Sequence, residues 1–222
     1  MLSCGNVGKT YATERGAVAA VSGIDLDVPR GQFAAIVGRS GSGKSSLMAM
    51  IGGLSRPTQG VVLLEDTDIW ALPDDGLADL RNREIGFVFQ FASLLPTLRV
   101  IDNVALPALL GRSKDSAAAY RRAADLLGQL GLAEHVDDYP TEISAGEQRR
   151  AVIARALINA PSLLLADEPT SDLDEQTEIE IMDRLRELNR DHGVTLIMVT
   201  HNLRLAEQAD RVLHIADGSL VS

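Results

Sequence analysis

The chain carries one stretch that decides its fold, Gly38-Arg39-Ser40-Gly41-Ser42-Gly43-Lys44-Ser45. It matches the phosphate-loop pattern Gly-x-x-x-x-Gly-Lys-Ser, in which glycines without side chains let consecutive backbone N–H groups turn toward phosphate oxygens. Lys44 adds a mobile positive charge, and the Ser45 hydroxyl can ligate Mg²⁺. The stretch therefore predicts that the chain binds a nucleoside triphosphate together with Mg²⁺.

The residues on both sides of the loop support this prediction. Residues 32–37 form a short apolar run typical of a buried strand, and residues 46–51 continue as a helix. The order strand, loop and helix is the context that the pattern requires, and the positive end of the helix faces the same anion. An ordinary Gly/Ser-rich turn, the alternative, would not need this context. The candidate nucleotide-binding residues here are Gly38, Arg39, Ser40, Gly41, Ser42, Gly43, Lys44, Ser45 and Ser46.

Length and composition set limits on the class of protein. The chain has 222 residues, of which 45% are hydrophobic and 23% charged, as in a globular domain with a substantial core. The formal net charge of −10 is spread along the sequence, which disfavours a nucleic-acid partner. Cys4 is the single cysteine, so we expect no internal disulfide and a reducing compartment. No apolar run is long enough to span a membrane, and residues 1–3 do not resemble a leader, so we expect any membrane role to come through a partner.

The apolar pattern predicts an α/β architecture. Residues 17–21 and the alternating residues 24–28 indicate short strands of a half-buried antiparallel sheet. Further strand candidates are residues 61–64, 85–89, 163–166 and 195–199, and helical patterns cover residues 116–130 and 175–190. Because continuous apolar runs alternate with helices, we expect a parallel sheet covered on both faces, with ligands at the carboxyl ends of its strands. We interpret residues 1–222 as a single domain with a helical lobe at about residues 91–160.

Polar residues follow three of the predicted strands. Asp167 and Glu168 end a buried strand, and with a phosphate loop upstream we expect Asp167 to serve the Mg²⁺ shell and Glu168 to align or deprotonate the attacking water. Gln90 offers a neutral amide suited to positioning water or Mg²⁺, and His201 could hydrogen-bond the terminal phosphate. Taken alone, the two acids are equally compatible with a solvated strand end, a lone histidine is more often a packed core residue, and a glutamine at a strand end is uninformative.

A further segment, residues 143–150, opens a helix. Ser144 and Glu147 form a Ser-x-x-Glu capping box, which alone would account for both residues. Capping and anion binding are compatible, because the same helix start offers free N–H donors and positive potential.

Taken together, these motifs resemble the ATP-binding subunits of ABC transporters over essentially the whole chain. The family signature Leu-Ser-Gly-Gly-Gln/Glu is similar to residues 143–147, and the order of phosphate loop, glutamine, signature, acidic strand end and histidine is specific to that family. Residues 89–91, 94–98, 103–104 and 106–107 are similar to the macrolide-exporter and lipoprotein-release group. The resemblance implies a P-loop NTPase with a RecA-like parallel core, an N-terminal antiparallel β subdomain and a helical subdomain.

The resemblance also implies partners and further site residues. Two copies would close head to tail, with each ATP between the phosphate loop of one and the signature of the other, contributed by Ser144, Ala145, Gly146 and Glu147. Tyr11 would stack on adenine, unless it is an ordinary strand-edge tyrosine. Residues 171–174 match the loop that crosses the dimer interface. The chain departs from the family at Ala145, usually glycine, and at Asp172, usually a small apolar residue, and both departures bear on closure of the dimer.

The predicted function is that of an ATPase subunit which hydrolyses MgATP and drives a membrane permease, for export or lipoprotein release. The resemblance implies a cytoplasmic protein, peripheral at the inner face of the cell membrane. Phe91, Leu94, Leu95 and Leu98 would line a groove for the permease, or simply pack in the helical lobe. The alternatives are a soluble ABC ATPase that is not coupled to transport, and a small P-loop phosphotransferase, which would not need the signature.

Overall fold

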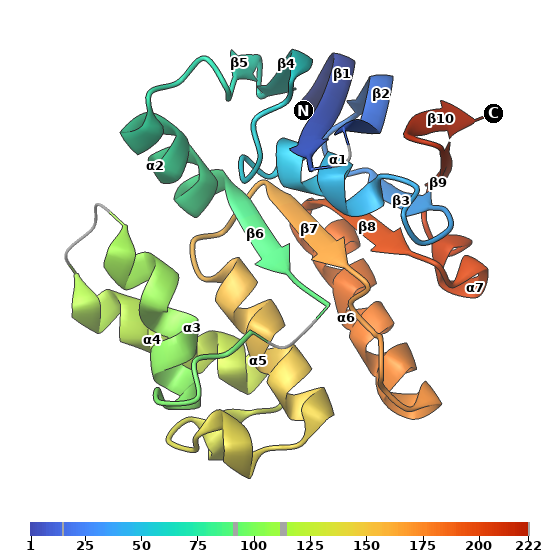
Figure 1. The fold of residues 1–222 in the computed structure, drawn as a ribbon. Helices are drawn as coiled ribbons and strands as arrows, with labels where there is room; N and C mark the ends of the chain where they lie inside the picture. The colour runs from blue at the N-terminus through green and yellow to red at the C-terminus, as the bar shows by residue number, and fades with distance from the viewer. Residues whose placement is uncertain (15, 91–92, 112–114, 222) are drawn as a thin grey trace. The chain divides into compact units, whose positions relative to one another are not determined.

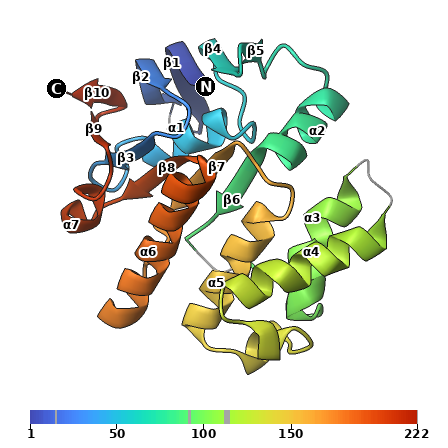
Figure 2. The same ribbon diagram turned by 180° about the vertical axis from the view of Figure 1, so that it is seen from behind.

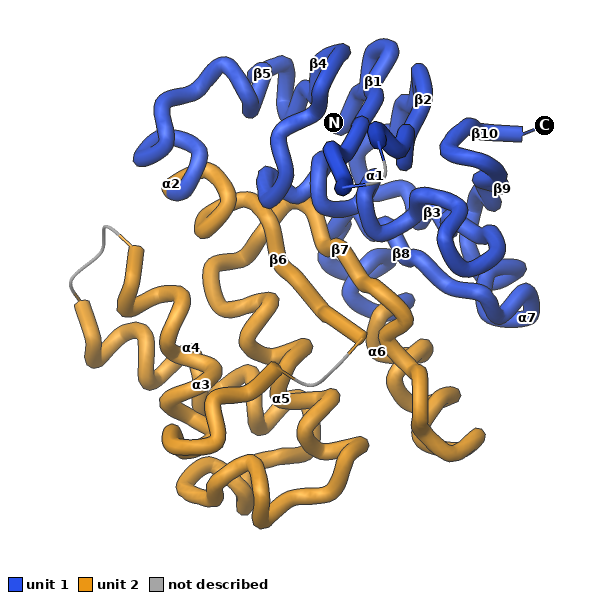
Figure 3. Tube along the Cα trace, in the orientation of Figure 1, with its two compact units in different colours: residues 1–78, 186–222 blue, residues 79–185 orange. Residues whose placement is uncertain are grey.

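The computed structural model describes residues 1–14, 16–90, 93–111 and 115–221. The chain forms two compact units (Figure 3), residues 1–78 with 186–222, called unit 1, and residues 79–185, called unit 2. Helices α2 (Asp74–Glu84) and α6 (Glu175–His192) contribute residues to both. The predicted groove residue Phe91 lies outside the described residues.

Unit 1 contains the expected antiparallel sheet (Figure 1), built from β1 (Leu2–Thr13), β2 (Gly16–Val28), β4 (Gln59–Leu64) and β5 (Thr67–Asp68) in the order β2-β1-β4-β5. In β2 the predicted alternation is confirmed, because Ile24, Leu26 and Val28 are buried while Asp25 and Asp27 are exposed. The prediction of separate short strands is wrong, since one strand runs through both segments. Its pairing with β1 shifts register at three points, which keeps the apolar side chains on the core face.

Unit 1 also contains parallel strands. The order β10-β9-β3-β8 places β3 (Phe33–Val37) between β8 (Thr195–Thr200) and β9 (Arg211–Ala216), parallel to both, with β10 (Ser219–Val221) antiparallel to β9. Every residue of β3 and β8 is buried, which explains why both sequences are continuous apolar runs. Helix α1 (Lys44–Ile51) follows β3, and the short α7 (Leu203–Ala206) follows β8. The apolar pattern does not predict β9 or α2, because polar side chains cover much of both.

Unit 2 joins two parallel strands, β6 (Ile85–Val88) and β7 (Leu163–Asp167), to a group of helices. The helices are α3 (Val100–Leu110), α4 (Ser116–Gln129) and α5 (Ala145–Leu157), with 3₁₀ turns η1 (Ala133–His135) and η2 (Pro140–Glu142). Helices α3, α4 and α5 pack against one another (Figure 2), and α5 also packs on β6. In the ranges that the structure describes, no helix combines the length and apolarity needed to cross a bilayer.

Candidate active site

The phosphate loop connects the end of β3 to the start of α1 in unit 1. Gly43 precedes α1 with a φ of 106°, a left-handed conformation that glycine adopts without steric cost. A Cβ at Gly43 would lie 2.3 Å from the carbonyl oxygen of Ala20, and a Cβ at Gly38 would lie 2.3 Å from that of Ile215. Both positions therefore exclude a side chain, and the backbone folds into a close turn ahead of the helix.

Lys44 crosses this turn from the first position of α1. Its Nζ donates to the carbonyl oxygens of Gly38, at 2.8 Å, and Arg39, at 2.9 Å. The hydroxyl of Ser42 is buried and finds no hydrogen-bond partner among the described residues. A curved run of backbone, an ammonium group and an unpartnered buried hydroxyl at a helix start fit the phosphates of a nucleotide.

Tyr11 lies beside the same helix start. Its hydroxyl is 3.4 Å from Ser46 Oγ, and the Lys9 ammonium lies 5.1 Å from the centroid of its ring. The hydrogen bond between the Tyr11 and Ser46 hydroxyls lowers the pKa of Tyr11 below its ordinary value of 10.0. Since 39% of the side chain remains exposed, the ring has a free surface next to the loop that could contact a planar base.

His201 directly follows β8. The parallel register pairs Val37 with Thr200, so that His201 leaves the sheet at the edge where Gly38 leaves β3. The side chain is exposed. Unit 1 therefore presents the phosphate loop and His201 at the carboxyl ends of neighbouring strands, as the sequence predicts.

Unit 2 brings together the glutamine and the two acids. The parallel register pairs Val88 with Ala166, so Gln90 and the Asp167–Glu168 pair follow their strands at one edge. Glu168 has a φ of 46°, in the left-handed region that non-glycine residues rarely adopt. Such conformations typically cost on the order of 1–3 kcal/mol and gather at functional sites. The backbone of Glu168 is consistent with a chemical role, although residues between other elements, such as Asp66 and Ala160, share the left-handed conformation.

The predicted capping box opens α5. The Ser144 hydroxyl accepts a hydrogen bond from the Glu147 N–H at 3.3 Å, and the Glu147 Oε2 accepts from both the N–H and the hydroxyl of Ser144 at 2.7 Å. These hydrogen bonds lower the pKa of the Glu147 carboxyl. A Cβ on Gly146 would lie 2.8 Å from Thr177 Cγ2, so a side chain here would require Thr177 to shift, whereas Ala145 is exposed.

Two residues outside the predicted site contact these groups. His135 Nε2 lies 3.3 Å from Glu147 Oε1, and Arg149 donates to backbone carbonyls at the end of β6. The sequence contains a signal for Arg149, because the residue is spaced three and four positions from the apolar Val152 and Ile153, as on one face of a helix. In the structure all three residues are buried. No comparable pattern marks His135.

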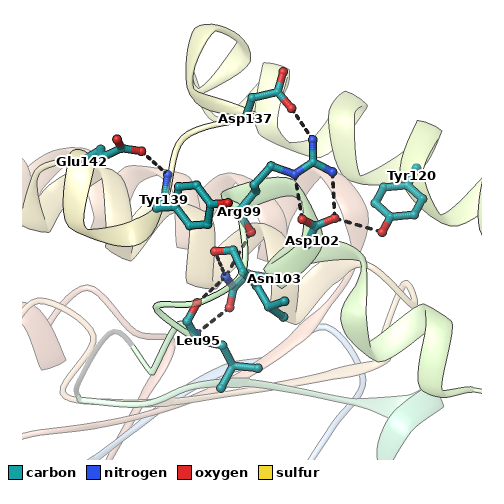
Figure 4. Close-up of polar contacts among 9 residues, drawn as sticks. Leu95, Arg99, Asp102, Asn103, Tyr120, Asp137, Tyr139 and Glu142 are labelled. Atoms are coloured by element: carbon teal, nitrogen blue, oxygen red, sulfur yellow. Dashed lines mark hydrogen bonds and ion pairs between the residues drawn. The ribbon is translucent and has the colours of Figure 1, made fainter.

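The turn at residues 95–99 in unit 2 is held by one buried amide (Figure 4). The Asn103 Oδ1 accepts from the Leu95 N–H at 2.7 Å, while its Nδ2 donates to the carbonyl oxygens of Leu95, Leu98 and Arg99 at 3.0–3.1 Å. Arg99 itself pairs with Asp102 and Asp137. The Leu95 side chain nevertheless stays 44% exposed, so an ordered turn presents an apolar side chain to its surroundings.

Ser45, Gln90 and Asp167 carry hydroxyl, amide and carboxylate oxygens, the hard ligands that Mg²⁺ prefers. Over residues 1–14, 16–90, 93–111 and 115–221, the structure has no group of three or more His, Cys, Asp or Glu side chains suited to a metal ion. Ser45 belongs to unit 1, and Gln90 and Asp167 belong to unit 2.

Comparison with known proteins agrees with these features. The family model described as "ABC transporter" matches residues 21–171. The lipoprotein-releasing system ATP-binding protein LolD of Syntrophotalea carbinolica is 45% identical over 220 residues, covering 99% of this chain and 96% of that protein. The uncharacterized ABC transporter ATP-binding protein YbbA of Escherichia coli K12 is 47% identical over 200 residues, covering 90% and 87%.

A solved structure agrees as well. The dimeric post-hydrolysis state of the ATP-binding cassette MJ0796 bound to ADP and Pi is 36% identical, has a TM-score of 0.91, and is matched over 100% of this chain and 97% of that one. These similarities confirm the predicted family and fold class. The chain belongs to the ABC transporter family, as one of its ATP-binding ATPase subunits.

Proposed function

We propose that this chain powers a membrane permease of the lipoprotein-release or export type through hydrolysis of MgATP. The observation that carries the proposal is the phosphate loop, with its excluded side chains at Gly38 and Gly43 and the Lys44 ammonium across it. The choice of permease type rests on similarity to LolD, a protein named for lipoprotein release. The soluble uncoupled ATPase and the phosphotransferase would share the phosphate loop, but the similarity to ABC transporter ATP-binding proteins disfavours both.

Each predicted residue has a role in the proposed hydrolysis. Lys44 and the loop N–H groups hold the phosphates, and Tyr11 contacts adenine. Glu168 orients a water molecule and accepts its proton as the water oxygen bonds to the terminal phosphorus and the bond to the ADP oxygen breaks. His201 donates to the terminal phosphate. Phosphoryl transfer needs little covalent chemistry from the protein, so positioning and charge neutralisation account for most of the catalysis.

Magnesium would be held by Ser45, Gln90 and Asp167 and would supply positive charge to the phosphates. The remaining site residues would come from a second copy of the chain. In the proposed head-to-tail dimer, Ser144, Ala145, Gly146 and Glu147 of one copy approach the nucleotide held by the other. The dimeric state of MJ0796, whose solved form holds ADP and Pi, supports this arrangement.

The permease would hold the chain at the cytoplasmic face of the membrane. The exposed Leu95, on the turn fixed by Asn103, is the apolar contact that we assign to it. Leu94 and Leu98 are half-buried, so they serve the packing of the turn as well as any groove.

The function is tested with two variants in one ATPase assay. Lys44→Ala should abolish ATP binding or turnover, because the phosphates lose the cation aimed at them. Glu168→Gln should retain ATP but lower kcat by about 10²- to 10⁴-fold, because the amide keeps the shape and loses the base. In size exclusion with ATP, Glu168→Gln should accumulate as a dimer.

The matched control is Arg30→Ala, which removes an exposed cation of unit 1 that pairs with Glu65. This variant should keep wild-type turnover, since an exposed pair contributes little. Normal turnover in folded Lys44→Ala protein would overturn the assignment of the phosphate loop, and unimpaired turnover of monomeric Glu168→Gln would overturn the role of that carboxylate.

A further inference from the structure

Arg149 is a buried cation within unit 2, with 5% of the residue exposed. From the second turn of α5 its Nη1 donates to the carbonyl oxygen of Phe89 and its Nη2 to that of Gln90, both at 2.6 Å. The same Nη2 lies 3.5 Å from the carbonyl oxygen of Ser171. The Arg149 side chain therefore connects three segments: helix α5, the residues that follow β6, and the turn that follows Glu168.

Burying the Arg149 charge in this way lowers the free energy of unfolding unless its hydrogen bonds compensate. Burial lowers the pKa of Arg149, and no carboxylate forms an ion pair with it within the described ranges. Its Nε is also buried without a partner among those residues. A buried charge with incomplete hydrogen bonding is expensive, and replacing such groups by apolar side chains of similar volume is often neutral or stabilising. The side chain therefore needs a reason other than stability.

The planar fork of arginine suits the task of holding carbonyl groups from separate segments. Its five donors keep a fixed geometry, whereas lysine offers one point charge on a flexible stem. The carbonyl groups of Phe89 and Gln90 both accept from Arg149 at 2.6 Å, and the Ser171 hydroxyl donates more weakly to the Gln90 carbonyl oxygen at 3.4 Å. Arg149 thereby sets the direction in which Gln90 leaves the strand.

We propose that Arg149 is a positioning residue for hydrolysis, which fixes the Gln90 backbone and the Ser171 turn in one arrangement with the start of α5. The proposal rests on the proposed roles of Gln90 and Glu168. Arg149 does not itself contact nucleotide in this scheme. Its effect would reach the reaction through Gln90, and through the turn in which the Ser171 N–H donates to the Glu168 carbonyl oxygen at 3.1 Å.

Asp172 has a second part in this arrangement. Its carboxylate is exposed, and its charge favours the cationic form of Arg149. Asp172, where the family resemblance implies a small apolar residue, directly follows Ser171, whose carbonyl oxygen lies 3.5 Å from Arg149 Nη2. We therefore expect the two residues to be energetically coupled.

The test compares Arg149→Met, Arg149→Lys and Arg149→Gln with Arg122→Met. Arg122 is the control for carbonyl contacts, because this exposed arginine also donates to two backbone carbonyls in unit 2, those of Ile158 at 2.5 Å and Leu157 at 3.4 Å, but not to the Gln90 segment. For each variant, kcat is normalised to the number of molecules that bind ATP, and KM for ATP, the Mg²⁺ dependence and Tm are measured.

Arg149→Met should lower normalised kcat by about 10- to 100-fold, because small displacements of positioning groups have effects of this size. KM for ATP should change by less than about threefold, because the phosphate loop and Tyr11 keep their own contacts. Arg149→Lys and Arg149→Gln should recover part of kcat, since each can reach one segment. Arg122→Met should lower Tm and leave normalised kcat unchanged.

The proposal is wrong if Arg149→Met has the normalised kcat of wild type. It is also wrong if kcat falls in proportion to Tm in the same way for Arg149→Met and Arg122→Met. If Arg149→Met does not fold, Arg149→Lys and Arg149→Gln decide by the same criteria. The coupling between Asp172 and Arg149 is measured with Asp172→Ala, whose effect on Tm should be smaller in the Arg149→Gln background than in wild type. Equal effects on Tm in wild type and in Arg149→Gln would show that the two residues are not coupled.

The same assay separates this inference from the proposed function. Lys44→Ala and Glu168→Gln must stop turnover for the proposed function to stand. If they do so while the Arg149 variants turn over normally, the positioning role alone is wrong.

Discussion

Ala145 stands where the family signature usually has glycine, at the first position of α5. The exposed methyl group lies between Ser144, whose hydroxyl caps the helix, and Gly146, where a side chain would require Thr177 to shift. In the proposed dimer the N–H groups of this helix start approach the phosphates held by the other copy. A single methyl group at this place therefore affects how closely the two backbones approach.

Ala145→Gly should strengthen ATP-driven dimerisation, because glycine allows a closer backbone approach. It should also lower the free energy of unfolding without nucleotide by about 0.5–1 kcal/mol, the usual cost of glycine at a helical position. Size exclusion at fixed ATP, in the Glu168→Gln background, measures the first effect, and urea unfolding measures the second.

Ala145→Ser serves as the control, since it keeps the Cβ atom and should leave the dimer fraction as it is. An unchanged or smaller dimer fraction in Ala145→Gly would show that the methyl group does not limit closure.

At the scale of elements, a histidine in η1 contacts the carboxylate that caps the start of α5. His135 lies between two carboxylates, with Nδ1 2.8 Å from Asp138 Oδ2 and Nε2 3.3 Å from Glu147 Oε1. Asp138, by a hydrogen bond, and the charge of Glu147 raise the pKa of His135 above its ordinary 6.5, against the opposing charge of Arg150. Because Glu147 also accepts hydrogen bonds from Ser144, protonation of His135 creates an ion pair that links η1 to the start of α5.

The sign of the pH dependence follows from the raised pKa. The unfolded state has the lower pKa, so the stabilisation by His135 is fully present below 6.5 and is lost as the pH rises through the higher folded-state value. The difference in free energy of unfolding between wild type and His135→Gln should therefore shrink with rising pH, which urea unfolding from about pH 5.5 to 8.5 would measure. A difference that is constant over this range, or that grows with pH, would contradict the prediction.

At the scale of the whole molecule, the proposed function requires a permease partner, so a residue outside the catalytic groups can matter for function. Leu95→Asp should weaken capture by the permease while basal ATPase activity stays close to wild type, because the side chain is exposed on a turn that Asn103 fixes through backbone groups. Co-purification with the permease and the ATPase activity of the isolated chain give the two measurements.

Leu110→Asp is the matched control for this surface. Leu110 is 74% exposed at the last position of α3, about 15 Å along the helix from its start next to the 95–99 turn. Leu110→Asp should leave permease capture intact. If Leu95→Asp unfolds the isolated chain, or if capture survives it, the leucine packs in the helical unit and does not serve docking.

The sequence by itself determined those features that depend on near neighbours in the chain. The phosphate loop needs its glycines, lysine and serine within eight positions, and the Ser144–Glu147 capping box needs two residues three apart. The buried strands β3, β7 and β8 are recognisable because their apolar runs are continuous. Local spacing is sufficient in each case, because the atoms that interact belong to one turn or one strand.

Only the tertiary structure decided which distant segments meet. Arg149 contacts the carbonyl of Gln90 across 59 positions, and Tyr11 reaches Ser46 across 35, and no local pattern fixes either pairing. The strained backbone of Glu168 and the exclusion of a side chain at Gly43 by Ala20 likewise arise from surrounding elements. The physical reason is that burial and hydrogen-bond geometry depend on how elements pack, whereas residue type and spacing are properties of the chain alone.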